Sequence, residues 1–168
     1  MRGYPVGMTD PHIVRDGDAP TPFTAEEIRA ATPRGLTIDG RSVDADGIET
    51  PWRRTYVEVD AAGSVSEWVE LDDHGNPVGE PERDAASWAQ LQAHASFPAA
   101  AVTIGRDRIE TPLGTLDCSR YEVGRPGGPL VFWFADAHPG MPIRYGRPRG
   151  EGWEALTEVL AIRVLPLG

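Results

Sequence analysis

The sequence predicts an α+β domain that consists mainly of an antiparallel β-sheet with two short helices. The first observation is a tetrapeptide that begins with Asp and ends with Gly, found at Asp44–Gly47, Asp60–Gly63 and Asp72–Gly75. This pattern is typical of type I turns, in which the Asp carboxylate accepts backbone N–H groups of the turn. The second observation is that segments alternating between apolar and polar residues lie around these turns. The third is a pair of segments with helical periodicity, each of which ends at a proline.

The first helix signal is the segment FTAEEIRAATP. Thr24 as N-cap and Glu27 three positions later form a capping box, and Phe23 and Ile28 occupy the positions of a hydrophobic staple. Pro33 then ends the helix after about two turns, because the residue before a proline is pushed out of the α conformation. The segment therefore predicts a short helix that begins after Thr24.

The domain organisation follows from composition. Residues 1–22 are rich in Pro, Gly and Asp and show no periodicity, so we expect a flexible N-terminal arm. We expect residues 23–168 to form a single domain, because a chain of 168 residues can bury a core without disulfides or metal ions.

Strands are expected on both sides of the acidic turns. The segment TYVEV (55–59) alternates, which places Tyr56 and Glu58 on the face opposite to its two valines. The segment VSEWVEL (65–71) predicts the next strand of an antiparallel meander. The acidic residues of this region then lie in solvated turns, and their spacing does not match an EF-hand calcium loop.

A second helix is expected in DAASWAQLQAHASFP (84–98), with Asp84 as N-cap and Trp88, Leu91 and Ala95 on one face. Strand signals then return at 101–109, 115–123, 130–135, 143–145 and 153–165. The strand LVFWFA (130–135) is apolar at every position, so we expect it to be covered on both faces.

Composition excludes several functions. All 16 basic residues are arginines, so the chain has no lysine for a Schiff base or a phosphate-binding loop. The net charge of −10 argues against binding to nucleic acid or to anionic membranes. A single cysteine forms neither an internal disulfide nor a cysteine-based zinc site. With no nucleotide, metal or nucleophile-elbow motif either, we expect no cofactor.

No apolar run in the sequence reaches the length that a transmembrane helix needs. The first twenty residues also lack the apolar segment of a signal peptide. We therefore expect a soluble, acidic, cytoplasmic protein without a transmembrane segment.

Two stretches of the sequence, ETPLGTLDCSRYEV (110–123) and FWFADAHPGMPIRY (132–145), resemble the paired signature of bacterial proteins with a lipoprotein-carrier (LolA-like) fold. The segments FTAEEIRAATP and SWAQLQAHASFP are similar to an uncharacterised bacterial branch of these proteins, and the resemblance spans residues 23–147. It implies a strongly curved antiparallel β-sheet, an incomplete barrel, wrapped around one or two short helices. It also implies a concave apolar face that holds acyl chains.

We expect this concave face to form a ligand pocket. Only one parity of residues 132–134 faces inward, because side chains alternate along a strand. The candidate pocket residues are Trp88, Leu91, His94, Cys118, Phe132, Trp133, Phe134, His138 and Arg144.

Several of these residues allow a second interpretation. Cys118 has the chemistry of a nucleophile, but its neighbour Asp117 disfavours a thiolate, and packing as a small apolar residue is favoured. Asp136 and His138 are two positions apart, which suits a carboxylate–imidazole pair or two ligands of a metal site, although ordinary turn chemistry is favoured. His94 lies at the edge of the apolar helix face, and Arg144 belongs to a basic loop that suits an anionic head group.

The function predicted from the sequence is a binding module for an apolar small molecule or lipid acyl chain. The alternatives are a structural or protein-interaction domain with a filled core, and an enzyme that uses His138 with Asp136, or Cys118. We assign no catalytic residue and no metal ligand, and the sequence does not indicate an oligomeric state.

Overall fold

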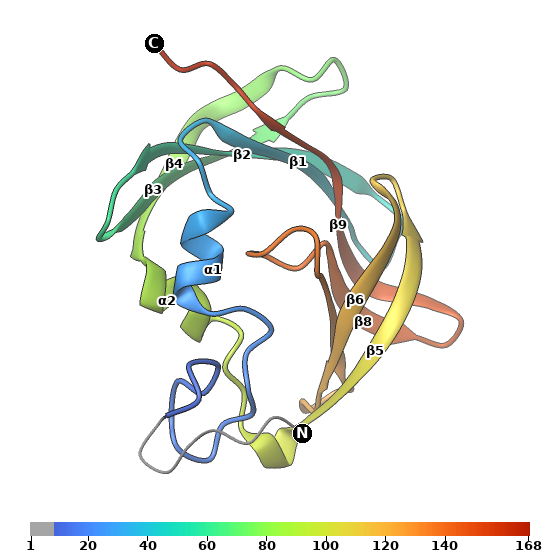
Figure 1. Ribbon diagram of the computed structural model, residues 1–168. Coiled ribbons are helices and arrows are strands. Elements are labelled where there is room, and N and C mark those ends of the chain that lie inside the picture. The colour runs from blue at the N-terminus through green and yellow to red at the C-terminus, as the bar shows by residue number, and fades with distance from the viewer. Residues whose placement is uncertain (1–8) are drawn as a thin grey trace.

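The computed structural model describes residues 9–168, which form one nine-stranded antiparallel sheet and two short α-helices (Figure 1). The prediction of an antiparallel sheet with two helices is therefore confirmed. In chain order the elements are α1 (Ala25–Ala30), β1 (Leu36–Val43), β2 (Glu49–Val59), β3 (Gly63–Leu71), β4 (Pro77–Ser87), α2 (Trp88–Ala93), a 3₁₀ turn (Ala99–Ala101), β5 (Val102–Thr111), β6 (Gly114–Val123), β7 (Leu130–Ala135), β8 (Arg144–Arg149) and β9 (Gly152–Val164).

The strand order is β4-β3-β2-β1-β9-β8-β7-β6-β5. Two meanders, β1–β4 and β5–β9, are joined in the middle by the antiparallel pairing of β1 with β9. The chain leaves one edge at β4 and enters the other edge at β5, and α2 forms part of this crossing. Within residues 9–168 no ladder joins β4 to β5, so the sheet is open. In Figure 1, β1–β4 lie above α1 and β5, β6, β8 and β9 lie to its right.

The three acidic turns have the predicted chemistry. The Oδ1 atoms of Asp44, Asp60 and Asp72 each accept two backbone N–H groups of their own turn, at 2.8–3.0 Å. One carboxylate oxygen of each of these aspartates is thus bonded to backbone N–H groups of its turn, as expected for a hairpin turn.

The first helix begins as predicted. The side chain of Thr24 accepts the N–H of Glu27, and the Glu27 side chain accepts the N–H of Thr24, which completes the capping box. The second helix starts later than predicted, because β4 continues through Ser87 and Ser87 is the N-cap. Asp84, the expected N-cap, instead pairs with Ser66 in the sheet.

The N-terminal segment differs from the flexible arm that its composition suggests. In its described part, the N–H of Ala19 donates to the carbonyl of Phe97 at 2.8 Å, and the side chain of Ser96 donates to Asp18 at 2.7 Å. Ala19 and Thr21 are buried. The backbone groups of this Pro- and Gly-rich segment thus bond to other parts of the protein where they would otherwise bond to water. Residues 1–8 of the expected arm lie outside the described residues.

Strand β7 is covered on both faces, as its uninterrupted apolar sequence predicts. Val131, Trp133 and Ala135 belong to one buried cluster. Phe132 and Phe134 pack in a second cluster, with residues from α1 and α2. The alternation of side chains along β7 therefore separates two apolar regions.

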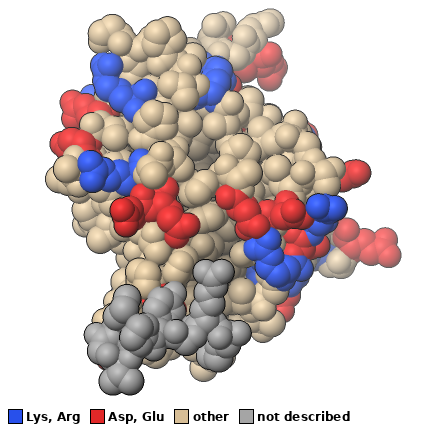
Figure 2. Space-filling view, in the orientation of Figure 1, with Lys and Arg blue, Asp and Glu red and all other residues tan. Residues whose placement is uncertain are grey.

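No helix within residues 9–168 has the length and apolarity to cross a membrane. On the face shown in Figure 2, acidic and basic side chains lie close to one another, and wide areas carry neither. The basic side chains of this face are thus not gathered into a single patch.

The centre of the sheet depends on Gly40, and we expect the variant Gly40→Ala to be destabilised. A Cβ atom at Gly40 would overlap the indole of Trp52 on the neighbouring strand, and Trp52 is only 3% exposed. Overpacking of this kind costs about 1–3 kcal/mol of unfolding free energy, measured by urea denaturation. The matched control is Gly105→Ala on the edge strand β5, where a new Cβ meets no atom within 4 Å. Equal effects of the two changes would contradict this role of Gly40.

Candidate ligand-binding cavity

A cavity of about 590 Å³ lies between the two helices and one face of the sheet. Its walls come from α1, α2, the strands β1, β2, β7, β8 and β9, and the loop between β7 and β8. This volume falls in the range of roughly 300–1,000 Å³ that is typical of small-molecule sites.

The interior of the cavity is apolar. Buried side chains that contribute to it come from α1, β1, β7, β9 and the loop before β8, namely Ile28, Ile38, Phe134, Val159 and Ile143. The hydroxyl of Thr32, which also lines it, is already bonded to the carbonyl of Ile28 at 2.6 Å. The walls therefore offer mostly dispersion contacts and little competition from polar groups.

The cavity reaches solvent at residues that are themselves exposed. Pro33 follows α1, His94 follows α2, Ala137 lies in the β7–β8 loop, and Val164 ends β9, where it is 57% exposed. These four residues place the opening beside the C-terminal ends of both helices. The polar ring of His94 is thus at the rim rather than in the interior.

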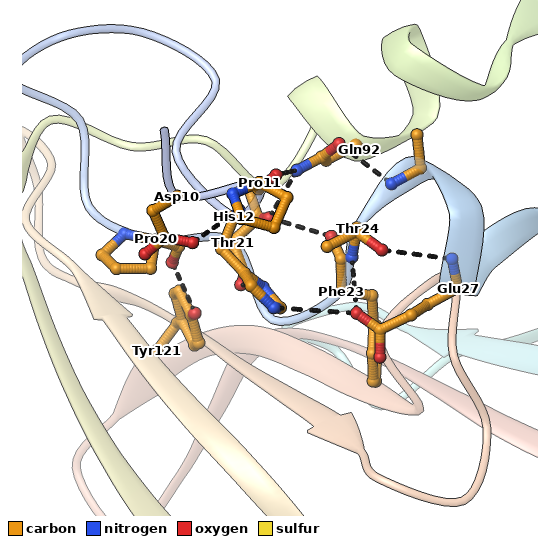
Figure 3. A network of polar contacts seen from close by, with 11 residues as sticks. Asp10, Pro11, His12, Pro20, Thr21, Phe23, Thr24, Glu27, Gln92 and Tyr121 are labelled. Atoms are coloured by element: carbon orange, nitrogen blue, oxygen red, sulfur yellow. Dashed lines mark hydrogen bonds and ion pairs between the residues drawn. The ribbon is translucent and has the colours of Figure 1, made fainter. Parts of the chain in front are cut away.

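Gln92 fixes the helices over the cavity (Figure 3). This side chain of α2 is only 7% exposed. Its Oε1 accepts the N–H of Ala25 in α1 at 2.9 Å, and its Nε2 donates to Pro11 O at 2.8 Å and to Thr21 Oγ1 at 3.0 Å. One amide thereby joins α2, the start of α1 and the N-terminal segment, and no polar atom of Gln92 is left unpaired.

The loop between β7 and β8, residues 136–142, is called the tongue below. In Figure 1 it projects from the sheet towards α1. At its start the N–H of Asp136 donates to Asp117 O at 3.0 Å, and the Asp136 carboxylate accepts both terminal nitrogens of Arg106. After its end the N–H of Ile143 donates to Trp133 O at 2.9 Å. Residues 137–142 all line the cavity.

The structure brings five of the nine predicted pocket residues to the cavity. Phe132 and Phe134 face it from β7, Leu91 and His94 reach it from α2 and the residue after it, and His138 reaches it from the tongue. The ring of Phe132 stacks on that of Tyr145, with centroids 5.6 Å apart. Of residues 132–134, the side chains at positions 132 and 134 thus face the cavity.

Trp88 is buried but does not line the cavity. Its indole N–H donates to the carbonyl of Asp60 at 2.9 Å, which ties the start of α2 to the β2–β3 turn. Its ring packs among Phe23, Ile28 and Tyr121. Trp88 therefore supports the helix from the side and does not contact the cavity.

The other three predicted residues, Cys118, Trp133 and Arg144, lie on the opposite face of the sheet, called the outer face below. Arg120, Trp133 and Arg144 are paired across β6, β7 and β8, so their side chains share that face. The two guanidiniums lie 5.6 and 5.9 Å from the Trp133 ring centroid, and the indole N–H donates to Asp107 at 3.0 Å. These contacts are cation–π packing on the outer face.

Cys118 is fully buried on the same outer face, opposite Ala135. Burial raises the pKa of its thiol, and the carboxylates of Asp136 and Asp107 raise it further. A thiol with these surroundings stays protonated at neutral pH and is a poor nucleophile. This environment agrees with the packing interpretation of Cys118.

Asp136 and His138 do not form a carboxylate–imidazole pair. The Asp136 carboxylate is bonded to Arg106, and among the described residues no acid lies within 4.0 Å of a His138 ring nitrogen. Nor does any group of three or more His, Cys, Asp or Glu side chains within residues 9–168 have the geometry to hold a metal ion. The arrangement provides an apolar container with two imidazoles in its wall.

Several cavity residues were not predicted from the sequence, among them Leu36, Ile38, Tyr56, Val159 and Ile162. Tyr56 had a usable signal, because the alternation of the segment around it separates it from the valines. Burial raises the pKa of its phenol, so the ring enters the cavity wall in its neutral form. The others become neighbours only through the pairing of β1 with β9.

Neither the protein-family models nor the curated proteins that we searched contain a match to this chain.

We expect Gln92→Met to destabilise the protein strongly. The change keeps the size of the side chain but leaves the N–H of Ala25 and the carbonyl of Pro11 without their partners. Unpaired buried groups cost about 1–3 kcal/mol each, so the loss of unfolding free energy should be roughly 2–4 kcal/mol. Gln90→Met is the control in the same helix, because the exposed Gln90 makes only capping contacts with Ser87. A loss no larger than that of the control would refute the joining role of Gln92.

Stability should fall at alkaline pH because of Tyr121. Its hydroxyl donates to Pro20 O at 2.7 Å, and burial raises the pKa of the phenol to about 12. An unfolded tyrosine loses its proton at about pH 10. The protonated Tyr121 hydroxyl therefore contributes its full stabilisation of the folded state below that pH, and this contribution is lost as pH rises to about 12. A shift of this size corresponds to roughly 3 kcal/mol. Denaturation at a series of alkaline pH values should show a flatter profile for Tyr121→Phe, and identical profiles would argue against this origin.

Proposed function

We propose that this protein is a binding module that holds an apolar small molecule or an acyl chain in the cavity between the helices and the sheet. The observation that carries the proposal is the cavity itself, about 590 Å³ in volume and apolar in its interior, although both helices are docked. Large contiguous apolar surfaces that are open to solvent are rare on monomeric proteins and usually mark binding sites. The persistence of so large a space indicates a site for a guest.

The proposal includes the shape of the fold, a strongly curved incomplete barrel of the lipoprotein-carrier (LolA-like) type. Three features support it. The sheet is open between β4 and β5, both helices lie on its inner side, and the chain crosses from one edge to the other through α2. An antiparallel sheet of this length carries a cumulative right-handed twist, which favours a trough-like inner face.

The cavity wall suits a flexible apolar chain. Phe132, Phe134 and Tyr145 supply aromatic faces, and Met141 of the tongue adds an adaptable thioether. Burying apolar surface of the guest yields about 25 cal/mol per Å² before the cost of immobilising it. Because few polar groups point inward, the cavity selects for apolar bulk rather than for a particular hydrogen-bonding pattern.

The alternatives receive less support from the geometry. A partner that adds a strand to β4 would meet Pro77 and Pro81, and prolines on an edge strand oppose such pairing. An enzyme that used Asp136 with His138 would need a carboxylate–imidazole contact, whereas the Asp136 carboxylate is bonded to Arg106. We therefore propose only the binding function.

The test places a large side chain in the cavity and the same side chain outside it. Ala31 lines the cavity, whereas its neighbour Ala30 is exposed and does not line it. We expect methyl laurate, an uncharged probe, to bind the native protein, and Ala31→Phe to weaken binding by at least roughly tenfold, because it removes space for several methylenes. Isothermal titration calorimetry and native mass spectrometry measure this.

Ala30→Phe is the matched control and should bind methyl laurate like the native protein. Thermal denaturation of both variants checks that each is folded. If methyl laurate does not bind the native protein, or if the two variants weaken binding equally, the cavity is not a site for an apolar guest.

A further inference from the structure

A second cavity, of about 330 Å³, lies on the same face of the sheet and includes Met141 of the tongue in its wall. Its wall is chemically different from that of the first. Two indoles, Trp52 and Trp68, line it together with the guanidinium of Arg54 and the carboxylate of Glu82. Ser42 and Thr157 add hydroxyl groups, which lie 3.2 Å from each other.

The two cavities adjoin each other. Met141 of the tongue and Tyr145 of β8 line both of them. On β2 the inward positions follow one another along the strand, so Trp52 and Arg54 face the second cavity and Tyr56 faces the first. An elongated molecule that occupied both cavities would therefore lie against Met141 and Tyr145.

Arg54 differs from its neighbour on the same strand. Arg53 points to the other face, where its Nε donates to Asp39 at 2.7 Å. Arg54 is half-buried and donates from Nη1 to Ser66 Oγ at 2.7 Å. In the part of the chain that the structure describes, no carboxylate lies within 4.0 Å of the Arg54 guanidinium. Among the described residues its positive charge thus has no ion-pair partner within this distance.

Three acidic residues lie near Arg54 on this face, Glu70, Glu82 and Asp84, and all three belong to β3 or β4. Arg54 pairs with Trp68 on β3, and Trp68 pairs with Glu82 on β4, so an indole lies between guanidinium and carboxylate. On the β1 side Arg54 pairs with Ile38, which lines the first cavity. An anion that arrives from the first cavity along β1 approaches Arg54 on the side away from these three acids.

We propose that Arg54 binds the anionic head of an amphiphile whose apolar body lies in the first cavity, an inference that rests on the proposed function. The class of ligand is a long-chain monocarboxylate. A carboxylate matches the planar fork of donors that arginine presents, and the bidentate contact is charge-assisted. Ser66 holds one terminal nitrogen of Arg54 in place, which reduces the entropy lost on binding. The indoles of Trp52 and Trp68 exclude water around the ion pair and strengthen it.

The experiment compares laurate with methyl laurate, which has the same chain and no charge. Calorimetry at neutral pH and low salt gives the dissociation constants for the native protein and for Arg54→Gln. We expect the dissociation constant of laurate for the native protein to be roughly ten- to a hundredfold lower than that of methyl laurate. This ratio corresponds to the free energy of one charge-assisted hydrogen-bonded contact. In Arg54→Gln this preference should vanish because laurate binding weakens while methyl laurate binding stays unchanged.

Arg125→Gln is the matched control, because it removes the same charge from an exposed position that lines neither cavity. It should retain the preference for laurate. Equal binding of the two probes by the native protein would overturn the role of Arg54 and leave the proposed function standing. Failure of both probes to bind would overturn both proposals. If Arg54→Gln does not fold, the comparison of the two probes on the native protein still decides.

Discussion

The antiparallel pairing of β1 with β9 is the constraint on which the rest of the structure depends. It joins two meanders at the centre of the sheet: β1–β4, which ends at one edge, and β5–β9, which begins at the other edge. The edge strands β4 and β5 are therefore at opposite ends of the strand order. The chain between β4 and β5 must cross from one edge to the other, and it does so with α2 on the face that carries the cavity. The same pairing brings Ile38 of β1 and Ile162 of β9 side by side in the cavity wall.

Strand alternation then divides the chemistry between the two faces. On β7 it directs Phe132 and Phe134 to the cavity and Trp133 to the outer face, where two guanidiniums cover the indole. On β2 it directs Arg54 inward and Arg53 outward to Asp39. A slip of one residue in either ladder would exchange these sets, so the buried aromatic residues fix the register as well as the site.

The sequence predicts those features that local physical chemistry decides. The turns at Asp44, Asp60 and Asp72 and the capping box of Thr24 need only neighbouring backbone groups. Strand β4 escapes prediction because Pro77–Ser87 is nearly all exposed and shows no apolar alternation. In β1 the apolar alternation is broken at Gly40, and the reason for that glycine is the ring of Trp52 across the sheet. The sequence predicts the lining residues of the cavity that belong to β7 and α2. It misses those of β1, β2 and β9, which become neighbours only when these strands pair.

The tongue shows how a segment that suggests a reactive site acquires a structural role. Asp136 is bonded to Arg106, but both side chains are more than half exposed, and such ion pairs contribute about 0–1 kcal/mol. The tongue is held mainly by other contacts: the backbone hydrogen bonds of Asp136 and Ile143 to neighbouring strands, and the side chain of Ile143, which is 2% exposed. Because its two ends are fixed in this way, Met141 is held at the boundary of both cavities. Together with Tyr145 of β8, the tongue therefore supplies the side chains that the walls of both cavities share.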